Sequence, residues 1–400
     1  MDATIILVGT ELLSGMTVDT NSIYMAEELN KYGIEIRYKL VVGDNIKDIV
    51  EAIKYGSSKS DLVILSGGLG PTMDDLTKLA ISEFLNVDLI VDKEDYLDLK
   101  NKYESYNLVL EDKNIREAEK PFGSQTIIND VGMCKGIYID KIVAFPGVPR
   151  ELYNLFPKFL KLLSSQGKLK KNIFIKDVLV WGIPESLLET KVSYLFKLKG
   201  IHYEFLVKDY GIIIRLQTID ANRSDVDKII LDLYKIIGEN IIGEDDERME
   251  ILIYKYLKDK NYFISLAESC TGGLIASKFI EVDGVSSVFK EGIVCYSNES
   301  KQTRLKVKKE TLDLYGAVSY ETCDEMLSGL DTEVKIATTG IAGPNGGTKE
   351  KPVGTVYIGV VVGEKKYIKK YLFNGNREKI RRLTMMRAMF EVLKIFKGVK

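Results

Sequence analysis

A serine at the end of an apolar run is the residue of this sequence best placed to act as a nucleophile. Phe263–Ala267 predicts a strand, and the following Glu268-Ser269-Cys270-Thr271-Gly272-Gly273 predicts the turn into a helix. Ser269 would then lie near the positive end of a helix, with backbone N–H groups close by, which suits a nucleophile and an oxyanion hole. The same geometry suits a simple helix cap, because serine and threonine are common N-caps.

The base for this serine has few possible sources. His202 is the only histidine among 400 residues, and it lies in a segment without other reactive groups, so a Ser-His or Cys-His hydrolase is disfavoured. Tyr296 and Lys301 follow a predicted strand, and burial would lower the pKa of a lysine towards that of a useful base. We therefore expect Lys301 to activate Ser269, and Tyr296 to relay a proton or bind the substrate. The alternative is a surface lysine and a core tyrosine.

A third strand-end segment supplies groups that could hold an anion. Val334–Ala337 predicts a strand, and Thr338–Gly347 after it contains four glycines, which permit close backbone approach to a phosphate or ribose. Lys351–Thr355 then re-enters the sheet. Arg377 begins the last predicted helix and offers a fork-shaped donor to an anion.

A glycine-rich turn near the N-terminus has the same kind of chemistry. Gly67-Gly68-Leu69-Gly70-Pro71-Thr72-Met73-Asp74-Asp75 follows an apolar strand and leads into a helix, so its backbone N–H groups could bind phosphate. Asp74 and Asp75 could hold a divalent cation beside that phosphate. The alternative is a tight strand–helix turn that Asp74 caps.

Two further segments support a ligand site at this turn. Gly9–Gly15 follows the first strand and contains Glu11, and Asp19-Thr20-Asn21 then caps the next helix. Because strand ends converge at the crevice of an open parallel sheet, we expect Glu11, Asp19 and Asp74 to share one site. Each of them could instead be a cap.

These segments need an α/β scaffold to bring them together. In the N-terminal part, apolar strands alternate with amphipathic helices, which predicts a parallel sheet covered on both faces. The expected strands are 3–8, 34–42, 62–65 and 142–145, and the expected helices are 20–32, 45–56 and 150–164.

The remainder divides at two polar segments. Ser164–Lys168 reads as a linker, and the acidic run Gly243–Glu247 marks a second boundary. Between them the pattern predicts strand, helix, strand, strand and helix, with Asp209-Tyr210-Gly211 as a hairpin turn. We therefore expect domains at 1–165, 170–243 and 246–398. In the third domain we expect strands at 262–266, 334–338, 353–361 and 366–372, with helices dominating 271–328 and a helix at 377–396.

Composition excludes several classes of protein. The formal net charge is −2 without a basic stripe, so duplex nucleic acid is a poor partner. No signal peptide and no apolar stretch of membrane-spanning length is evident. The four cysteines form no CxxC pair, so neither a disulfide framework nor a zinc site is indicated. We expect a cytoplasmic protein that binds small molecules and contacts neither nucleic acid nor membrane.

The N-terminal motifs resemble the molybdopterin-binding (MogA/MoaB-like) family and, more closely, the N-terminal domain of the CinA family. Gly67–Thr77 and Phe145–Pro149 carry the resemblance, whereas Thr10, Arg116 and Met133-Cys134-Lys135 depart from it. The resemblance implies a three-layer fold and, in some members, hydrolysis of ADP-ribose with a divalent metal. The nucleotide or phosphate site would comprise Glu11, Asp19, Asn21, Gly67, Gly68, Gly70, Thr72, Asp75, Pro146 and Gly147, with Asp74 on the metal.

The C-terminal motifs resemble the C-terminal CinA domain, whose recognised activity is deamidation of nicotinamide mononucleotide. Ala267–Gly273, Tyr296–Glu299, Lys301, Gly340–Pro344 and Lys351–Thr355 carry this resemblance. It implies Ser269 as nucleophile, Lys301 as base, Tyr296 as helper, no cofactor and a homodimer. The substrate would contact Thr271, Gly272, Gly273, Ser286, Ser287, Thr339, Gly340, Ala342, Gly343 and Arg377. The middle module resembles the KH-like α+β connector of full-length members. It lacks a Gly-x-x-Gly loop, so RNA binding is not carried over.

The sequence thus predicts an amide hydrolase that acts by acyl transfer on nicotinamide mononucleotide. Backbone N–H groups around Thr271 to Gly273 would hold the oxyanion, and Tyr296 or Lys301 would protonate the departing ammonia. One alternative is a nucleotide-binding regulator without turnover. Another makes the N-terminal domain the main enzyme, a metal-dependent ADP-ribose pyrophosphatase.

Overall fold

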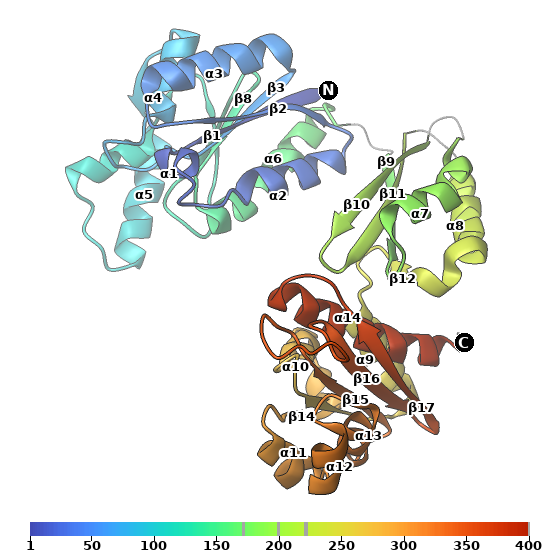
Figure 1. Ribbon diagram of the computed structural model, residues 1–400. Helices are drawn as coiled ribbons and strands as arrows, with labels where there is room; N and C mark the ends of the chain where they lie inside the picture. Colours follow the sequence, from blue (N-terminus) through green and yellow to red (C-terminus); the bar gives the residue numbers. More distant parts are fainter. Residues whose placement is uncertain (170–172, 198–200, 220–222, 399–400) are drawn as a thin grey trace. The chain divides into compact units, whose positions relative to one another are not determined.

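The computed structural model describes residues 1–169, 173–197, 201–219 and 223–398 of the chain. The chain divides into two compact units, Met1–Phe174 and Ile175–Lys400 (Figure 1). Both units are mixed α/β structures, as the alternation of strands and helices predicts.

The first unit is built on a sheet with strand order β2-β1-β3-β8-β7-β6. The first four of these strands are parallel, and β7 and β6 continue antiparallel. Every residue of β3 is buried, and burial on both faces explains the apolar run of its first four residues, Leu62–Leu65. The strands are β1 Asp2–Val8, β2 Glu35–Val42, β3 Leu62–Ser66, β6 Gln125–Ile127, β7 Gly136–Ile139 and β8 Ile142–Phe145.

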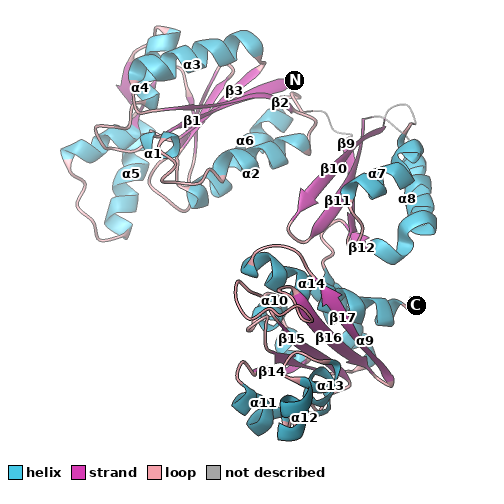
Figure 2. Ribbon diagram, viewed as in Figure 1, coloured by secondary structure: helices cyan, strands magenta, loops and turns pink. Residues whose placement is uncertain are grey.

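Helices cover both faces of this sheet and make three layers. Helices α2 (Asn21–Asn30) and α6 (Pro149–Ser165) share one apolar cluster with the sheet, and α3 (Ile46–Lys59) and α4 (Thr77–Leu85) share the other. The predicted three-layer fold is confirmed (Figures 1 and 2). The smaller elements are α1 Thr10–Leu13, β4 Leu89–Val91, α5 Lys93–Ser105, the 3-10 helix η1 Asp112–Ala118 and β5 Glu119–Pro121.

The middle module opens the second unit with a sheet of order β10-β11-β9-β12. The hairpin turn lies where it was predicted, and because Lys208 pairs with Gly211, its loop consists of Asp209 and Tyr210. The predicted order is observed, but the sequence missed β12, which ends inside the acidic run read as a boundary. The elements are β9 Ile173–Val180, α7 Glu185–Val192, η2 Ser193–Phe196, β10 Ile201–Lys208, β11 Gly211–Ile219, α8 Arg223–Ile237, η3 Gly238–Asn240 and β12 Ile241–Glu244.

The C-terminal part carries a sheet of order β14-β13-β15-β16-β17. The first three strands are parallel, and β16 and β17 are antiparallel. The strands are β13 Ile264–Glu268, β14 Phe289–Val294, β15 Val334–Gly340, β16 Thr355–Val362 and β17 Lys365–Leu372. The helices are α9 Met249–Lys260, α10 Leu274–Ile280, η4 Val285–Ser287, α11 Asn298–Leu305, α12 Lys309–Tyr315, α13 Tyr320–Ser328 and α14 Arg377–Lys397 (Figure 2).

These helices again form two layers. Residues of α9, α10 and α14 belong to one apolar cluster, and residues of α11, α12 and α13 belong to another. Because β13, β14 and β15 are parallel, the segments that follow them all begin at the carboxyl ends of these strands, at one edge of the sheet. The three C-terminal motifs occupy those segments.

The middle module and the C-terminal part share a core. Leu179, Ile213 and Ile242 belong to the same cluster as the apolar face of α14. The ring of Trp181 lies 5.0 Å from that of Phe390, centroid to centroid. The predicted boundary near residue 245 thus falls inside one unit, and the domain limits stay a prediction. Among the described helices, none is both long and apolar enough to cross a membrane.

Candidate active site

The structure brings Ser269 and Lys301 together at the carboxyl ends of β13 and β14. Lys301 Nζ lies 3.1 Å from Ser269 Oγ, and the two side chains are 1% and 8% exposed, in that order. The N–H of Ser269 donates to the carbonyl of Thr338 at 2.9 Å, which ties the serine to β15. Ser297 caps α11 through the N–H of Ser300, so Lys301 on the first turn points back to the sheet edge.

The three oxygen partners of Lys301 can be served by an ammonium group, which would donate to all of them, or by a neutral amine. Its Nζ lies 2.8 Å from the carbonyl oxygen of Cys295 and 3.4 Å from that of Tyr296. A neutral amine has two N–H donors for these carbonyls and one lone pair, which can accept the hydroxyl proton of Ser269. Burial lowers the pKa of Lys301 below its ordinary value of 10.5, in the direction that a general base requires.

The turn after Ser269 contains backbone N–H groups that donate to no oxygen atom in the part of the protein that the structure describes. Within the described residues, the N–H groups of Cys270, Thr271 and Gly272 donate to no oxygen atom; those of Cys270 and Thr271 are directed at the Cys270 thiol, and that of Gly272 has no acceptor. The N–H of Gly273, by contrast, donates to Glu268 Oε2 at 3.0 Å. The predicted oxyanion donors are therefore corrected: Gly273 serves the cap of α10, and the donors that remain come from Cys270 to Gly272.

Glu268 explains how this turn is held. Its carboxylate is 1% exposed and also accepts from the N–H groups of Ile275, at 3.2 Å, and Ala276, at 2.8 Å. A buried carboxylate at a helix N-terminus satisfies donors that would otherwise lack partners, and the positive helix end stabilises its charge. Glu268 rather than Ser269 therefore caps the helix, which leaves the serine hydroxyl free for chemistry.

Tyr296 does not reach Ser269 as a proton relay would. Its hydroxyl accepts from Arg377 Nη2 at 3.1 Å, and its side chain is 64% exposed. Arg377 Nη1 also donates to the carbonyl of Gly343 at 2.8 Å. The structure thus links Tyr296 to Arg377 and Gly343, two of the residues predicted to contact the substrate.

Other predicted residues lie at the same edge of the sheet, and their side chains make contacts within the protein. The hydroxyls of Thr271 and Thr338 are 2.8 Å apart in the interior, and the hydroxyl of Thr339 donates to the carbonyl of Ala317 at 2.6 Å. Gly340 ends β15, and Ala342 is buried just beyond it. These side chains fix the strand ends.

Ser286 and Ser287 lie elsewhere in this chain. They form η4, immediately before β14, and the register pairs Phe289 with Ile264 at the start of β13. Ser269 follows the other end of β13. Within one chain these two serines therefore lie at the opposite edge of the sheet from Ser269, because residues before a parallel strand lie at the other edge from residues after it. Their contact with the substrate stays a prediction.

The N-terminal unit contains a second candidate site, a cleft of 660 Å³ at the carboxyl ends of β1, β3 and β8. The cleft is lined by carboxylates and by the glycine-rich turn. Eight predicted residues line it: Glu11, Gly67, Gly68, Gly70, Asp74, Asp75, Pro146 and Gly147.

The glycine turn has a backbone conformation with positive φ angles that favours glycine. Gly67 and Gly68 have φ of 110° and 66°, and a Cβ on Gly67 would lie 2.0 Å from the carbonyl oxygen of Val8. Within the described residues, the N–H groups of Gly68, Leu69 and Gly70 donate no hydrogen bond. The backbone therefore offers donors to an anion in the cleft.

Three predicted residues do not line this cleft and instead make hydrogen bonds within the protein. Asp19 accepts from the N–H of Ser22 at 2.9 Å, so it caps α2 and does not share a site with Glu11 and Asp74 as expected. Asn21 donates to the carbonyl of Gly147 at 2.8 Å, and the Thr72 hydroxyl donates to Asp75 at 2.6 Å.

The residues that depart from the family pattern can be located relative to this cleft. Thr10 donates through its hydroxyl to Asp44 at 2.8 Å, and Asp44 lines the cleft, so a carboxylate is still present there. Arg116 lies outside and donates to the carbonyl of Thr72 at 2.9 Å. Met133 and Cys134 line the cleft.

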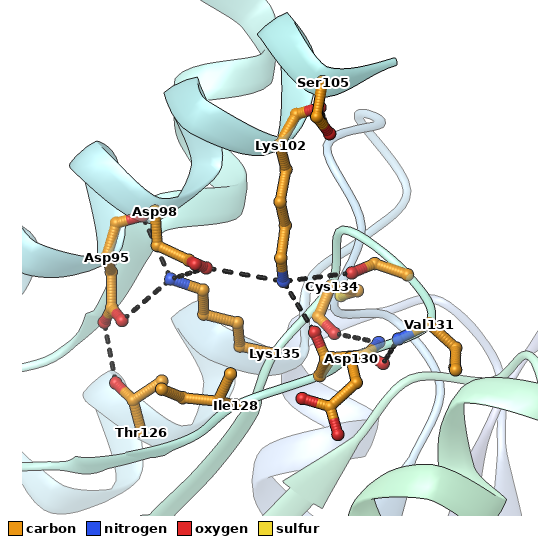
Figure 3. A network of polar contacts seen from close by, with 12 residues as sticks. Asp95, Asp98, Lys102, Ser105, Thr126, Ile128, Asp130, Val131, Cys134 and Lys135 are labelled. Carbon is orange, nitrogen blue, oxygen red and sulfur yellow. Dashed lines mark hydrogen bonds and ion pairs between the residues drawn. The ribbon is translucent and has the colours of Figure 1, made fainter.

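Lys135, the last of those departures, points into a buried ionic network (Figure 3). Its Nζ lies 3.0 Å from Asp95 Oδ1 and 2.8 Å from Asp98 Oδ2. Lys102 completes the network by donating to the carbonyl of Asn129 at 2.6 Å. The network ties α5 to the segment that precedes Cys134, so this wall of the cleft is fixed.

A metal site is not complete in the protein alone. The described part of the chain has no group of three or more His, Cys, Asp or Glu side chains arranged to hold a metal ion. Asp75 is engaged with Thr72, whereas Asp74 is exposed at the cleft. Mg²⁺ commonly uses one or two carboxylates together with substrate phosphates, so Asp74 fits an ion that arrives with a nucleotide.

Comparison with known proteins identifies the family of the chain. Residues 246–396 match the family model described as "CinA C-terminal domain", and residues 4–165 match "Probable molybdopterin binding domain". A CinA-like protein of Fusobacterium nucleatum is 55% identical over 397 residues, which is 99% of this chain and 98% of the relative. The chain belongs to the CinA family.

Solved structures of CinA proteins match part of the chain. The competence/damage inducible protein CihA of Agrobacterium tumefaciens is 35% identical, with 37% of this chain and 93% of that chain covered and a TM-score of 0.36. The CinA protein of Thermoplasma acidophilum is 32% identical, with 41% of this chain and 96% of that chain covered and a TM-score of 0.37.

Several residues at the two CinA sites were missed from the sequence. Arg381 lies one helical turn after Arg377 and donates to the carbonyl of Thr271, and the i,i+4 spacing could have indicated it. Asp44, Glu117 and Glu151 line the N-terminal cleft without belonging to any motif. Burial raises the pKa of both glutamates above the ordinary carboxyl value.

The cysteines of this CinA protein are expected to be unreactive while it is folded. All four are free and buried, and burial raises the pKa of Cys134 and of Cys270 to about 12. Thiolates are the reactive form, so iodoacetamide at pH 8 should label no cysteine of the native protein and all of them in denaturant. Mass spectrometry of labelled peptides measures this. Rapid native labelling of Cys270 would instead make it a rival nucleophile to Ser269.

Proposed function

We propose that this CinA-family protein is a nicotinamide mononucleotide deamidase, which converts the mononucleotide and water to nicotinic acid mononucleotide and ammonia. The observation that carries the proposal is the buried contact of 3.1 Å between Lys301 Nζ and Ser269 Oγ. A lysine that burial drives towards neutrality, next to a hydroxyl with unclaimed N–H donors beyond it, is the arrangement of an acyl-transfer site.

The first half-reaction forms an acyl-enzyme. Lys301 takes the proton of Ser269 as Oγ attacks the carboxamide carbon, and the carbonyl oxygen becomes an oxyanion. N–H groups from Cys270 to Gly272 hold that charge. Lys301 then returns the proton to the amide nitrogen, the C–N bond breaks, and ammonia leaves an ester on Ser269.

The second half-reaction restores the serine. Lys301, again neutral, takes a proton from water as the water oxygen attacks the ester carbon. The same N–H groups hold the second oxyanion, and the carbon–Oγ bond breaks with return of the proton to Oγ. The acid product then carries the second oxygen from water, so all atoms of one amide and one water are accounted for.

The nucleotide portion of the substrate would be held by the segment after β15 and the start of α14. Arg377 is exposed at its guanidinium end and already joins Tyr296 to the loop at Gly343. A phosphate is bidentate and anionic, so it can replace one of these neutral acceptors on the guanidinium. We propose Arg377 and the backbone of Gly343–Gly347 as the phosphate and ribose contacts.

The direct test is release of ammonia from nicotinamide mononucleotide by the purified full-length protein, with product identity checked by chromatography. Turnover without added cofactor is the expected result. Binding by calorimetry without any ammonia would reject the enzyme and favour the alternative of a nucleotide-binding regulator.

The N-terminal cleft favours a second candidate function, hydrolysis of ADP-ribose to AMP and ribose 5-phosphate. The observation behind it is the set of unclaimed N–H groups at Gly68, Leu69 and Gly70 in a cleft of 660 Å³. A divalent cation held by Asp74 and the diphosphate would offset the negative charge of the carboxylates around it. The chemistry that the ion supplies is charge neutralisation of the diphosphate.

Gly68→Ala is expected to lower ADP-ribose cleavage roughly 100-fold, because small displacements of binding groups have effects of this order. A Cβ at Gly68 would lie 2.5 Å from Thr77 Oγ1, and φ there is 66°. Gly123→Ala is the matched control, since Gly123 has a φ of 83° and no atom within 4 Å of the added carbon. AMP formation with Mg²⁺ measures both. Equal rates for the two variants would contradict a role for the loop.

A further inference from the structure

Arg381 contacts the turn that carries Ser269, although it lies more than a hundred residues later in the chain. Its Nη2 donates to the carbonyl oxygen of Thr271 at 2.7 Å, and its Nε approaches the same oxygen at 3.3 Å. The neighbouring Arg382 pairs with Asp209 at 2.7 Å. Arg381, by contrast, has no carboxylate partner within the described residues. Its charge is directed at one peptide group.

That peptide group is the one that carries an unclaimed donor. The carbonyl of Thr271 and the N–H of Gly272 belong to the same amide, and this N–H donates no hydrogen bond within the described residues. A cation that binds the oxygen of an amide draws electron density from its nitrogen and strengthens the N–H as a donor. Arg381 therefore polarises the Gly272 N–H.

The orientation of this amide is set from three sides. Arg381 holds its oxygen, and Glu268 holds the next N–H along the chain, that of Gly273, at 3.0 Å. The Thr271 hydroxyl lies 2.8 Å from that of Thr338 on β15. Gly272 has a φ of 60°, and a Cβ there would lie 3.4 Å from Arg381 Nη2, so glycine permits the close approach.

We infer that Arg381 is a positioning residue that orients and polarises the Thr271–Gly272 peptide, so that the Gly272 N–H becomes the main donor to the oxyanion formed when Ser269 attacks an amide. This inference rests on the proposed deamidase function. Arg381 touches neither nucleophile nor base, and its effect passes through the peptide it holds.

The role has a kinetic signature that a packing role lacks. The oxyanion exists in the transition state and not in the bound substrate, so loss of its stabilisation lowers kcat and leaves KM near its original value. Removal of a direct oxyanion donor costs roughly 100- to 1,000-fold in kcat. Because Arg381 acts through the peptide, we expect a smaller loss of about 10- to 100-fold.

The experiment compares Arg381→Met and Arg381→Lys with Arg382→Met in the full chain, using nicotinamide mononucleotide. Both Arg381 variants should lose kcat, the methionine variant more than the lysine variant, with KM within about twofold of wild type. Arg382→Met removes a neighbouring surface arginine from the same helix and should keep wild-type kcat. Ethylguanidinium added to Arg381→Ala should restore part of the lost rate.

Other outcomes overturn the inference in distinguishable ways. If wild type releases ammonia and the Arg381 variants keep its kcat, or raise KM alone, the positioning role is rejected and the proposed function stands. If wild type releases no ammonia, the proposed function fails and the inference fails with it. Product affinity, measured by calorimetry, checks that each variant retains a folded site. If the methionine variant does not fold, the lysine variant decides.

Discussion

Ser269→Ala is expected to lower kcat for ammonia release by at least about 1,000-fold, because removal of a nucleophile leaves only the binding groups and the oxyanion donors. The variant should still bind nicotinamide mononucleotide, since the N–H donors and Arg377 are unchanged. Loss of one hydroxyl should alter stability little, because the cap of α10 is supplied by Glu268 and not by the serine. Steady-state kinetics with calorimetric binding measures both effects.

Ser265→Ala provides a matched control for this variant. Ser265 lies in β13, the strand that Ser269 follows, is fully buried, and its hydroxyl has no hydrogen-bond partner within the described residues. The same atom is removed four residues away without any contact to Lys301. We expect unchanged kcat for Ser265→Ala, whereas full activity of Ser269→Ala would reject the serine mechanism and with it the proposed reaction.

The placement of Ser269 and Lys301 at one edge of the sheet follows from a rule that sequence can apply. Segments that follow parallel strands leave from one edge of the sheet, so the chain after β13 and the chain after β14 lie at the same edge. Two residues with complementary chemistry, Ser269 and Lys301, stood in those segments, and the scarcity of histidine favoured the lysine. Strand direction places the two segments at one edge, and the adjacency of β13 and β14 in the sheet brings them into contact.

Side-chain direction is what the sequence could not supply. Tyr296 stands beside Cys295 in the chain, but it turns to Arg377 because that guanidinium is available in space. The sequence pattern placed Glu268 in the turn. In the structure it is the last residue of β13, and its carboxylate accepts hydrogen bonds from N–H groups at the start of α10. These choices depend on which partners the tertiary fold presents, and strand or helix periodicity carries no information about them.

The N-terminal unit shows the same limit in another form. The glycine turn and the three-layer fold were predictable, because glycine conformation and apolar periodicity are local properties. The contribution of Asp44 was not, because it depends on Thr10 holding that carboxylate from 34 residues away. A departure from a family pattern at one position can thus be compensated at another that no motif includes.

Lys301→Met is expected to lower kcat at least about 1,000-fold, because the serine then has no group to take its proton. Lys301→Arg should be equally inactive although it keeps the positive charge, since a guanidinium is not deprotonated in proteins. This pair of variants separates a base from an electrostatic contact. If arginine retained activity, the charge of Lys301 and not its lone pair would be the useful property.

Lys397→Met is the control, because Lys397 is partly buried and donates to two backbone carbonyls, those of Ile241 and Ile242, with no hydroxyl among its hydrogen-bond partners within the described residues. Burial lowers the pKa of Lys397 as it does that of Lys301, and of the two only Lys301 has a serine partner. We expect wild-type kcat for this control. A loss that matched Lys301→Met would assign the effect to removal of a buried lysine in general.

The pH dependence of kcat/KM for the wild-type protein tests whether Lys301 must be neutral or protonated for activity. Only the neutral amine can accept the proton of Ser269, so kcat/KM should rise with pH through the pKa of Lys301 and level off above it. Burial places that pKa below 10.5, which moves the rise towards neutral pH. The residual rate of Lys301→Arg should lack this rise. A wild-type profile that fell with increasing pH would require a protonated Lys301, and the serine would then need another base.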